Sequence, residues 1–228
     1  MGSEARAIPL WEEKLAVRLR GFGPVGVFAV LCILYATWYA PPLAFLMALV
    51  WTRLSRTPWS EIGYVRPKNW AADLTIGVLL GVALKFLMKA VVMPLLGADP
   101  INLAYHSLVG NRAAIPGILL TTLVAAVGEE TLFRGYLFER LGKLLGSSLA
   151  AQATIVLATS FWFGLNHFVL LGISGAENAA IFGLVFGAIY AVTRRIWLLM
   201  AVHAAADFVA CAIIYLGMEA KVAHWVFR

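Results

Sequence analysis

The chain consists largely of long, continuous runs of apolar residues separated by short charged segments. A helix that crosses a bilayer needs about 20 mostly apolar residues. A shorter run at 41–52, which begins with Pro41-Pro42, predicts a marginal span that pairs with the run before it. The pattern predicts an all-α fold, a polytopic transmembrane helix bundle of about seven spans. The longer runs cover residues 23–40, 74–96, 115–138, 149–170, 178–193 and 196–216.

The first 20 residues differ from the rest, because charged side chains alternate there with Leu and Trp. This mixture predicts a short N-terminal amphipathic helix that lies at the membrane interface. Seven spans leave little room for a separate domain. Residues 1–228 are therefore predicted to form a single membrane domain, with 1–20 as its interfacial segment.

Composition supports a membrane location. Of 228 residues, 62% are apolar and 13% charged, whereas soluble domains are about half apolar and about a quarter charged. The net charge of +6 does not indicate nucleic-acid binding, because Lys and Arg gather in alternate loops. By the positive-inside rule, the N-terminus is cytoplasmic. We expect a multi-pass protein of a bacterial-type cell membrane, with the lipid bilayer as a partner and no nucleic acid.

Ionisable residues inside the apolar runs carry the candidate chemistry. Each costs about 2.5–3.5 kcal/mol at mid-membrane on insertion scales, so such residues usually face the bundle interior and find partners. Glu130 and Arg134 are spaced i, i+4 and should meet on one helical face. Glu129 lies about 100° around the helix from Glu130 and has no helical cation partner. An unpaired carboxylate in such a site suits a general base or acid.

Two later runs contribute imidazoles. His167 closes the fifth run, and His203 is spaced i, i+4 from Asp207 in the last one. Imidazole exchanges protons near neutral pH. Two histidines, a free carboxylate and an Asp from three helices are sufficient to hold and deprotonate one water molecule.

Taken alone, each of these residues can be explained by a structural role. A Glu–Arg pair is often only a tie, and a lone His in a helix is more often a packing residue. Their joint presence in different apolar runs favours a site. Lys85 and Lys89, also spaced i, i+4, either snorkel to the interface or pair with an acid such as Asp207.

Three short motifs, one in each of three apolar runs, resemble in type and order those of the CPBP family. This is the CAAX prenyl protease and bacteriocin-processing family, also called Abi. A Phe-Arg-Gly at 133–135 and the segment 61–67, which looks like the family's LGL-x-RP segment, extend the resemblance. The implied catalytic core covers 115–216. The motifs are Glu129-Glu130-x-x-x-Arg134, Phe163-x-x-x-His167 and His203-x-x-x-Asp207.

The resemblance implies an intramembrane endopeptidase that acts on a peptide or protein substrate in the membrane. Eukaryotic relatives remove the last three residues of prenylated CAAX proteins, and bacterial relatives handle other peptides or act in bacteriocin immunity. By the same resemblance, Glu129 is the catalytic carboxylate and His167 is its partner in activating water.

The remaining roles also follow from the resemblance. His203 and Asp207 help to bind the water or stabilise the oxyanion, and Glu130 and Arg134 brace the site. The third motif of the family often ends in Asn, whose amide can donate to an oxyanion. An ionised Asp207 cannot, so it either is protonated or orients His203.

Two mechanisms fit these residues. In the favoured one, no cofactor takes part: Glu129 deprotonates a water held by His167, and His203 donates to the oxyanion. In the alternative, Glu129, His167 and His203 hold zinc, which lowers the pKa of bound water to about 7. No H-E-x-x-H motif is present, so the usual helical zinc-protease arrangement is absent.

The depths of the residues set a condition. At about 1.5 Å per residue, Glu129, His203 and Asp207 lie at similar depths, whereas His167 lies nearer the outer end of its helix. His167 joins the site only if the fifth helix begins below the membrane, tilts strongly or breaks near Gly164.

Two other functions use the same residue types. A membrane carboxylate with histidines can form the relay of an ion-coupled transporter, although no inverted repeat or pair of broken helices is visible in the sequence. A non-catalytic immunity or scaffold protein could keep the fold and bind a peptide.

Overall fold

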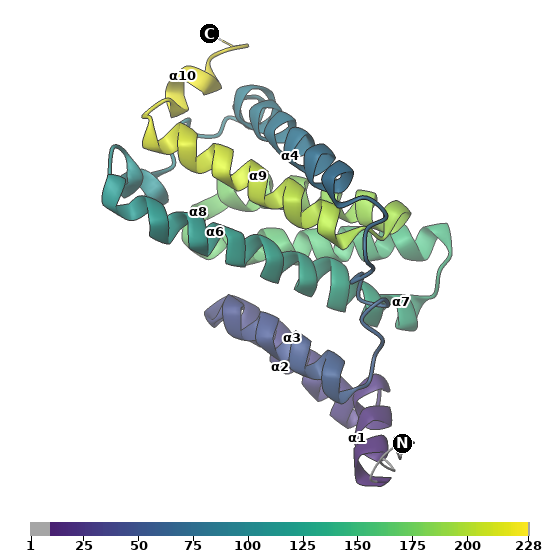
Figure 1. Cartoon of the computed structure of the whole chain (residues 1–228). Coiled ribbons are helices and arrows are strands. Elements are labelled where there is room, and N and C mark those ends of the chain that lie inside the picture. Colours follow the sequence, from purple (N-terminus) through teal and green to yellow (C-terminus); the bar gives the residue numbers. More distant parts are fainter. Residues whose placement is uncertain (1–9, 228) are drawn as a thin grey trace, which may run out of the picture.

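The computed structural model describes residues 10–227 and shows a helical bundle (Figure 1). No strand occurs among these residues, so the all-α prediction is confirmed. Residues 1–9 of the predicted interfacial segment lie outside the described residues, and the rest forms a helix. The α-helices are α1 Leu10–Arg20, α2 Pro24–Tyr39, α3 Pro41–Leu54, α4 Trp70–Leu87, α5 Met93–Leu95, α6 Ile115–Glu130, α7 Phe138–Leu145, α8 Leu149–Thr193, α9 Ile196–Tyr215 and α10 Glu219–Ala223. Two π-helical segments, η1 Met88–Val92 and η4 Thr131–Leu137, join α4 to α5 and α6 to α7, and η2 Leu103–Leu108 and η3 Arg112–Ala114 are 3₁₀ turns.

Helix α8 is a hairpin rather than one rod. Its backbone leaves the helical region at Gly172, where φ is 65° and ψ is −161°. Close contacts of Gly164 with Ala180, and of Gly183 with Ser160, show that the two arms pack antiparallel. The separate runs predicted at 149–170 and 178–193 therefore correspond to the two arms.

The positively charged segments gather at one end of the bundle, on the right of Figure 1. Lys143 in the last turn of α7 pairs with Glu61 of the α3–α4 loop at 2.9 Å. Arg56 of the same loop pairs with Glu12 of α1, also at 2.9 Å. Arg195, before α9, pairs with Asp73 of α4. The helices thus alternate between a charged end and an opposite end, which contains Gly172 and the segment 97–114.

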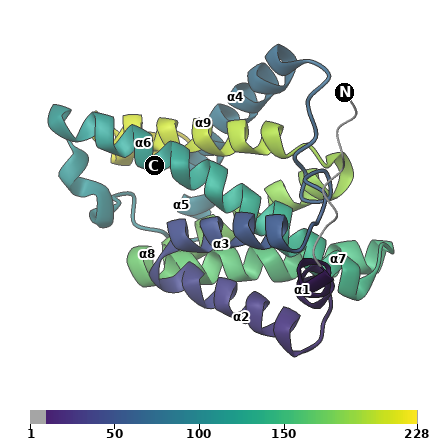
Figure 2. The ribbon, with the colours of Figure 1, turned by 60° about the horizontal axis from the view of Figure 1, so that its bottom comes forward.

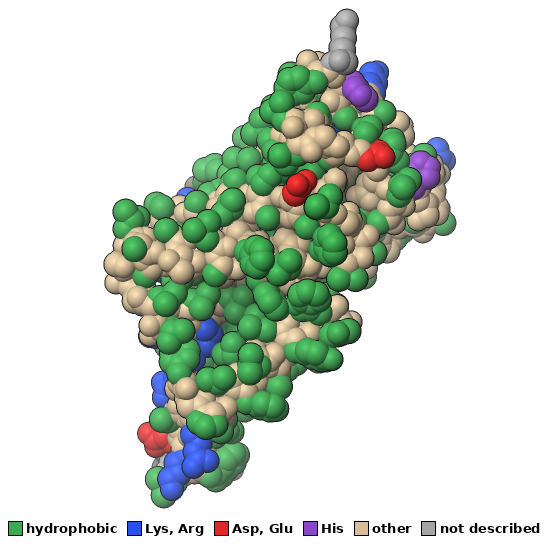
Figure 3. All heavy atoms as spheres, turned by 180° about the vertical axis from the view of Figure 1, so that it is seen from behind, with side chains coloured by type: hydrophobic (Ala, Val, Ile, Leu, Met, Phe, Trp, Pro, Cys, Tyr) green, Lys and Arg blue, Asp and Glu red, His purple; other side chains and the backbone are tan. Residues whose placement is uncertain are grey.

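Fewer helices than the seven predicted spans are both long and apolar among the described residues. Within residues 10–227, four helices are long and apolar enough to cross a membrane, or five if α1 and α2, bent by 64°, form one span. The two arms of the α8 hairpin form one of these helices, and α3 is shorter than all of them, so seven spans are not confirmed. Hydrophobic side chains are spread over much of the face in Figure 3, as expected for a surface that meets lipid. The four helices are Trp70–Leu95, Arg112–Leu145, Leu149–Thr193 and Ile196–Tyr215.

Helix α9 occupies the centre of the bundle and contacts α4, α6 and α8 (Figures 1 and 2). Small residues allow α4 to approach it closely. A Cβ at Gly77 would lie 2.6 Å from Ala201 Cβ, and one at Gly81 would collide with Val202 O. Because lipid gives helices no hydrophobic reason to associate, such small-residue contacts are the usual basis of packing in membranes. They fix the rotation of α9, which carries two candidate site residues.

We expect Gly81→Ala to destabilise the protein by about 1–3 kcal/mol, because the added methyl group overpacks the contact between α4 and α9. Gly117→Ala is the matched control, since nothing lies within 4 Å of the Cβ position there. Thermal unfolding in detergent compares the two. A Gly81→Ala protein that unfolds at the wild-type temperature would contradict the close packing.

Candidate active site

The two adjacent carboxylates of the first motif point in different directions. They end α6, directly before the π-helical segment η4, and π segments are frequent at functional sites. Glu130 is fully buried, whereas 23% of the Glu129 side chain is exposed to a cavity. The predicted separation of the two acids around the helix is therefore confirmed.

Glu130 is the centre of a buried polar cluster. Its Oε1 accepts a hydrogen bond from Arg134 Nη1 at 3.0 Å, as the i, i+4 spacing predicts. The same oxygen lies 2.8 Å from His203 Nδ1 on α9. Arg134 Nη2 also donates to Gly183 O, at 3.2 Å, on the second arm of α8. One carboxylate thus ties together α6, α9 and, through Arg134, α8.

Aromatic rings enclose the Arg134 guanidinium. Its central carbon lies 5.1 Å from the ring centroid of Phe163 and 5.4 Å from that of Phe186. Cation–π attraction strengthens when the cation is desolvated, as it is here. Phe163 also packs against both histidines, His167 at 4.6 Å and His203 at 6.2 Å between centroids. The phenylalanine of the second motif therefore separates the arginine from the cavity.

His203 stands between the two acids of the first motif. Because its Nδ1 donates to Glu130, its Nε2 is the nitrogen that faces the cavity. Nε2 lies 3.7 Å from Glu129 Oε2 and 3.5 Å from Asp207 Oδ2. These distances exceed ordinary hydrogen bonds and suit a bridging water or substrate oxygen. The i, i+4 pairing of His203 with Asp207 is confirmed.

His167 reaches the same cavity from the first arm of α8. Its Nδ1 donates to Phe163 O at 2.8 Å, because a carbonyl oxygen can only accept, and this leaves Nε2 free to accept. Gly164 is helical, so the break that the sequence allowed there is absent, and the chain turns at Gly172, between the two predicted runs.

Glu129 and His167 lie at similar depths because the helix that carries Glu129 is longer than predicted. It continues through η4 and α7 to Leu145 instead of ending at residue 138. Glu129 then lies about as many residues before the α7–α8 turn as His167 lies after it. Charged residues beyond 138 resembled a loop in the sequence, but Arg140 and Glu139 form a buried pair there.

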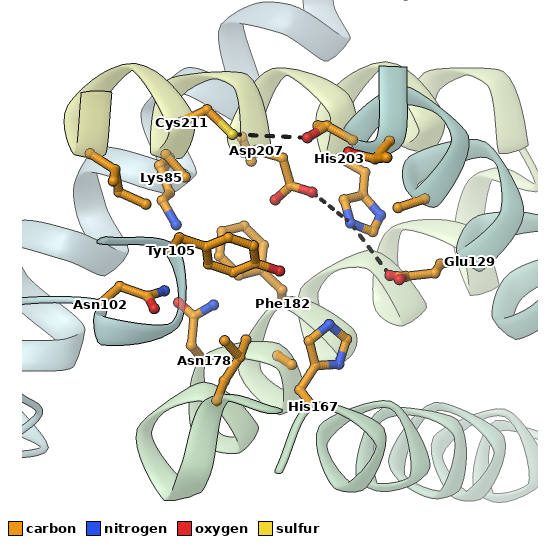
Figure 4. Close-up of a pocket in the computed structure, with 18 of the residues that line it drawn as sticks. Lys85, Asn102, Tyr105, Glu129, His167, Asn178, Phe182, His203, Asp207 and Cys211 are labelled. Atoms are coloured by element: carbon orange, nitrogen blue, oxygen red, sulfur yellow. Dashed lines mark hydrogen bonds and ion pairs between the residues drawn. The ribbon is translucent and has the colours of Figure 1, made fainter. Parts of the chain in front are cut away.

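Two connected cavities meet at these residues. The first, about 280 Å³, is lined by Glu129, His167, His203 and Asp207 (Figure 4). The second, about 490 Å³, is mainly apolar; it also reaches Glu129 and His167 and extends to Phe45 of α3. The acid and imidazole groups of three helices therefore share one hollow, with an apolar chamber on one side.

The structure brings all six predicted site residues together, in two groups. Glu130 and Arg134 lie behind the site, and the other four face the cavity. Within the described residues, no group of three His, Cys, Asp or Glu side chains is arranged to hold a metal ion. Sequence reasoning missed the polar residues that face the cavity from other elements. They are Asn102, Tyr105 and Asn178.

Residues 111–209 match the family model described as type II CAAX prenyl endopeptidase, Rce1-like. The chain carries an Rce1-like domain. This domain includes all six predicted site residues, and the resemblance to the CAAX prenyl protease family is confirmed over its length. Together with the apolar helices, the match indicates an integral membrane protein that contains a domain similar to those of a protease family. No curated protein and no solved structure matches the chain.

We expect Arg134→Met to lower the free energy of unfolding by about 3–5 kcal/mol, because it leaves the buried Glu130 carboxylate without its cation. Lys143→Met serves as the control, since its pair with Glu61 is exposed and such pairs contribute about 0–1 kcal/mol. Denaturant titration of the detergent-solubilised protein measures both. Equal, small losses would contradict the bracing role of Arg134.

Proposed function

We propose that this protein is an intramembrane endopeptidase that hydrolyses a peptide bond of a membrane-associated or lipidated substrate. The observation that carries the proposal is the shared cavity, where Glu129, His167 and His203 from three helices surround one space. The Rce1-like match over residues 111–209 supports the reaction class.

Glu129 acts as the general base. It takes one proton from a water whose other proton is donated to His167 Nε2. The resulting hydroxide attacks the carbonyl carbon of the scissile bond, and the carbonyl oxygen becomes the oxyanion. When the carbon–nitrogen bond breaks, the Glu129 carboxyl group returns the proton to the leaving amine. A positioned general base contributes about 10²–10⁴-fold to the rate.

His203 stabilises the oxyanion through Nε2. To donate there while Nδ1 donates to Glu130, the ring must carry both protons. Three carboxylates, those of Glu129, Glu130 and Asp207, lie within 4 Å of the ring and stabilise this imidazolium. One preorganised donor of this kind contributes roughly 2.7–4 kcal/mol to the transition state. Asp207 orients the ring and does not itself donate.

The apolar cavity accommodates the hydrophobic part of the substrate. Its walls come from Pro41 and Phe45 of α3 and from Leu120 and Val124 of α6, and it ends at Glu129. Ligand sites that combine apolar walls with a few convergent polar groups are the usual form of small-molecule pockets. A lipid chain or apolar side chains would lie there and place the adjacent peptide bond beside the base.

The membrane arrangement that fits this function has seven crossings. These are α2, α3, α4–α5, α6–α7, the two arms of α8, and α9, with α1 at the interface. The collected positive segments then lie on the cytoplasmic side, together with the N-terminus, in a bacterial-type cell membrane.

We expect Glu129→Gln to reduce peptide cleavage by at least 10²-fold in detergent while the fold is retained, because the amide cannot accept the proton of water. Cleavage of a fluorescent S-farnesylated peptide is measured with and without a chelator. Full activity of the Gln variant would remove Glu129 as the base.

The chelator arm decides between the two mechanisms. Wild-type activity that survives chelation supports the mechanism without a cofactor. Activity lost with chelator and restored by zinc would establish the alternative, in which Glu129, His167 and His203 hold the metal. Binding without cleavage would favour a peptide-binding immunity or scaffold protein, and proton flux in liposomes would favour a transporter.

We expect Asp207→Asn to keep activity within about ten-fold of wild type, because an amide can still hold His203 and can also donate to an oxyanion. Asp207→Ala should lose considerably more. The ratio of kcat values for the two variants is the measurement. Similar losses would show that the negative charge of Asp207 is required.

A further inference from the structure

Lys85 of α4 is a cation in the catalytic cavity that the mechanism above does not use. It projects into the hollow near Tyr105 and the two asparagines in Figure 4. Among the described residues it has no hydrogen bond and no carboxylate within ion-pair distance, and its ammonium lies 6.0 Å from the Phe182 ring centroid. Lysine is rarely placed in a membrane interior without a partner, so a partner from outside the chain is indicated.

The neighbouring Lys89 shows what a structural lysine looks like here. Its Nζ donates to Pro100 O at 2.5 Å and pairs with Glu219 of α10 at 3.5 Å. Glu219 in turn accepts the backbone N–H of Asn102 at 3.0 Å. Lys89 therefore fastens the 97–102 loop and positions Asn102, whereas Lys85, one turn earlier, is left free.

Further hydrogen-bonding groups converge beside Lys85. The side chains of Asn102, Tyr105 and Asn178 line the same end of the cavity (Figure 4). Burial raises the pKa of the Tyr105 phenol, and the charges of Asp207 and Glu129 act in the same direction, so the phenol keeps its proton and can donate. Asn102 and Tyr105, like Lys85, precede residue 111, so the Rce1-like match does not account for them.

We propose that Lys85, with Asn102, Tyr105 and Asn178, binds the carboxylate at the C-terminus of the peptide substrate. The proposal rests on the endopeptidase function and adds the substrate's polar end to it. The apolar chamber and the cavity that contains the Lys85 cluster both reach Glu129, and Tyr105 lines both of them. A substrate that is apolar on one side of the scissile bond and ends in a carboxylate on the other matches both.

The charge and donors suit a carboxylate. A single ammonium neutralises one negative charge, and charge-assisted bonds to a carboxylate are about twice as strong as neutral ones. A second hollow of about 330 Å³ shares Lys85, Asn102 and Asn178 and continues beneath the 98–104 segment. In this proposal, the product that carries the carboxylate occupies these polar hollows rather than the apolar chamber.

Binding tests the proposal without turnover. Glu129→Gln protein in detergent is titrated with a fluorescent S-farnesylated peptide that ends in a free carboxylate, and with its C-terminal carboxamide. We expect the acid to bind roughly ten-fold more tightly, as a hydrogen bond to a charged group allows. Adding Lys85→Met should abolish the preference, and Lys85→Arg should restore part of it. Lys221→Met, an exposed lysine outside the cavity, should leave it unchanged.

Three results would overturn the proposal. The first is equal affinity for the peptide acid and the peptide carboxamide, or no measurable binding of either peptide. The second is a preference that survives Lys85→Met. The third is tight binding of a carboxamide with glutamate as its last residue, since that would assign the cluster to an acidic side chain.

Stability and cleavage give separate readings. Lys85→Met should unfold at or above the wild-type temperature, because an unpaired cation is removed. A lowered unfolding temperature would instead make Lys85 a structural residue and overturn the proposal. If the wild-type protein binds the acid more tightly through Lys85 but cleaves neither peptide, the endopeptidase function is contradicted. The proposed carboxylate site is then still supported.

Discussion

The hydrogen bonds of one buried carboxylate oxygen hold this site together. Glu130 Oε1 meets both Arg134 and His203, and Arg134 continues to the backbone of Gly183. In a low-dielectric interior, a charge is tolerated only when its partners are close and well oriented. The cluster therefore constrains how α6, α8 and α9 can rotate against one another. The fixed rotation of α6, α8 and α9 also fixes the positions of the catalytic side chains, because these side chains lie on the same three helices.

Charge balance links the brace to the chemistry. The acids Glu129, Glu130 and Asp207 lie within 4 Å of His203, and Glu130 also pairs with Arg134. Opposite charges this close to one another lower the cost of placing ionisable groups at mid-membrane. Activation of water moves a proton among these groups and does not create a new net charge in the cavity. This explains why so many ionisable residues occur together in a chain that is otherwise so apolar.

The sequence predicted what depends on local geometry. The apolar runs became helices, and the pairs Glu130–Arg134 and His203–Asp207 formed because i, i+4 neighbours always share a helical face. The contact between Glu130 and His203 could not be foreseen, since it depends on how α6 and α9 rotate and pack. The same holds for the residues that face the cavity from α4, η2 and α8.

Two glycines have different roles in α8. A break near Gly164 was one of three conditions for His167 to join the site, but Gly164 stays helical and its missing side chain serves close packing, because a Cβ there would lie 2.9 Å from Ala180 Cβ. Gly172 is the true break, with a positive φ that only glycine adopts readily and open space around its Cβ position. Sequence alone does not distinguish a glycine that permits contact from one that permits a bend.

Because Glu129 and Glu130 are adjacent in the sequence, they determine which nitrogen of His203 faces the cavity. Glu129 and Glu130 approach different nitrogens of the same imidazole, Nε2 and Nδ1. Because Glu130 occupies Nδ1 from the buried side, His203 can exchange a proton with the cavity only at Nε2. That nitrogen lies between the base Glu129 and Asp207, beside the space that the attacking water must occupy. A single turn of α6 thus supplies both the group that fixes the imidazole and the group that takes the proton.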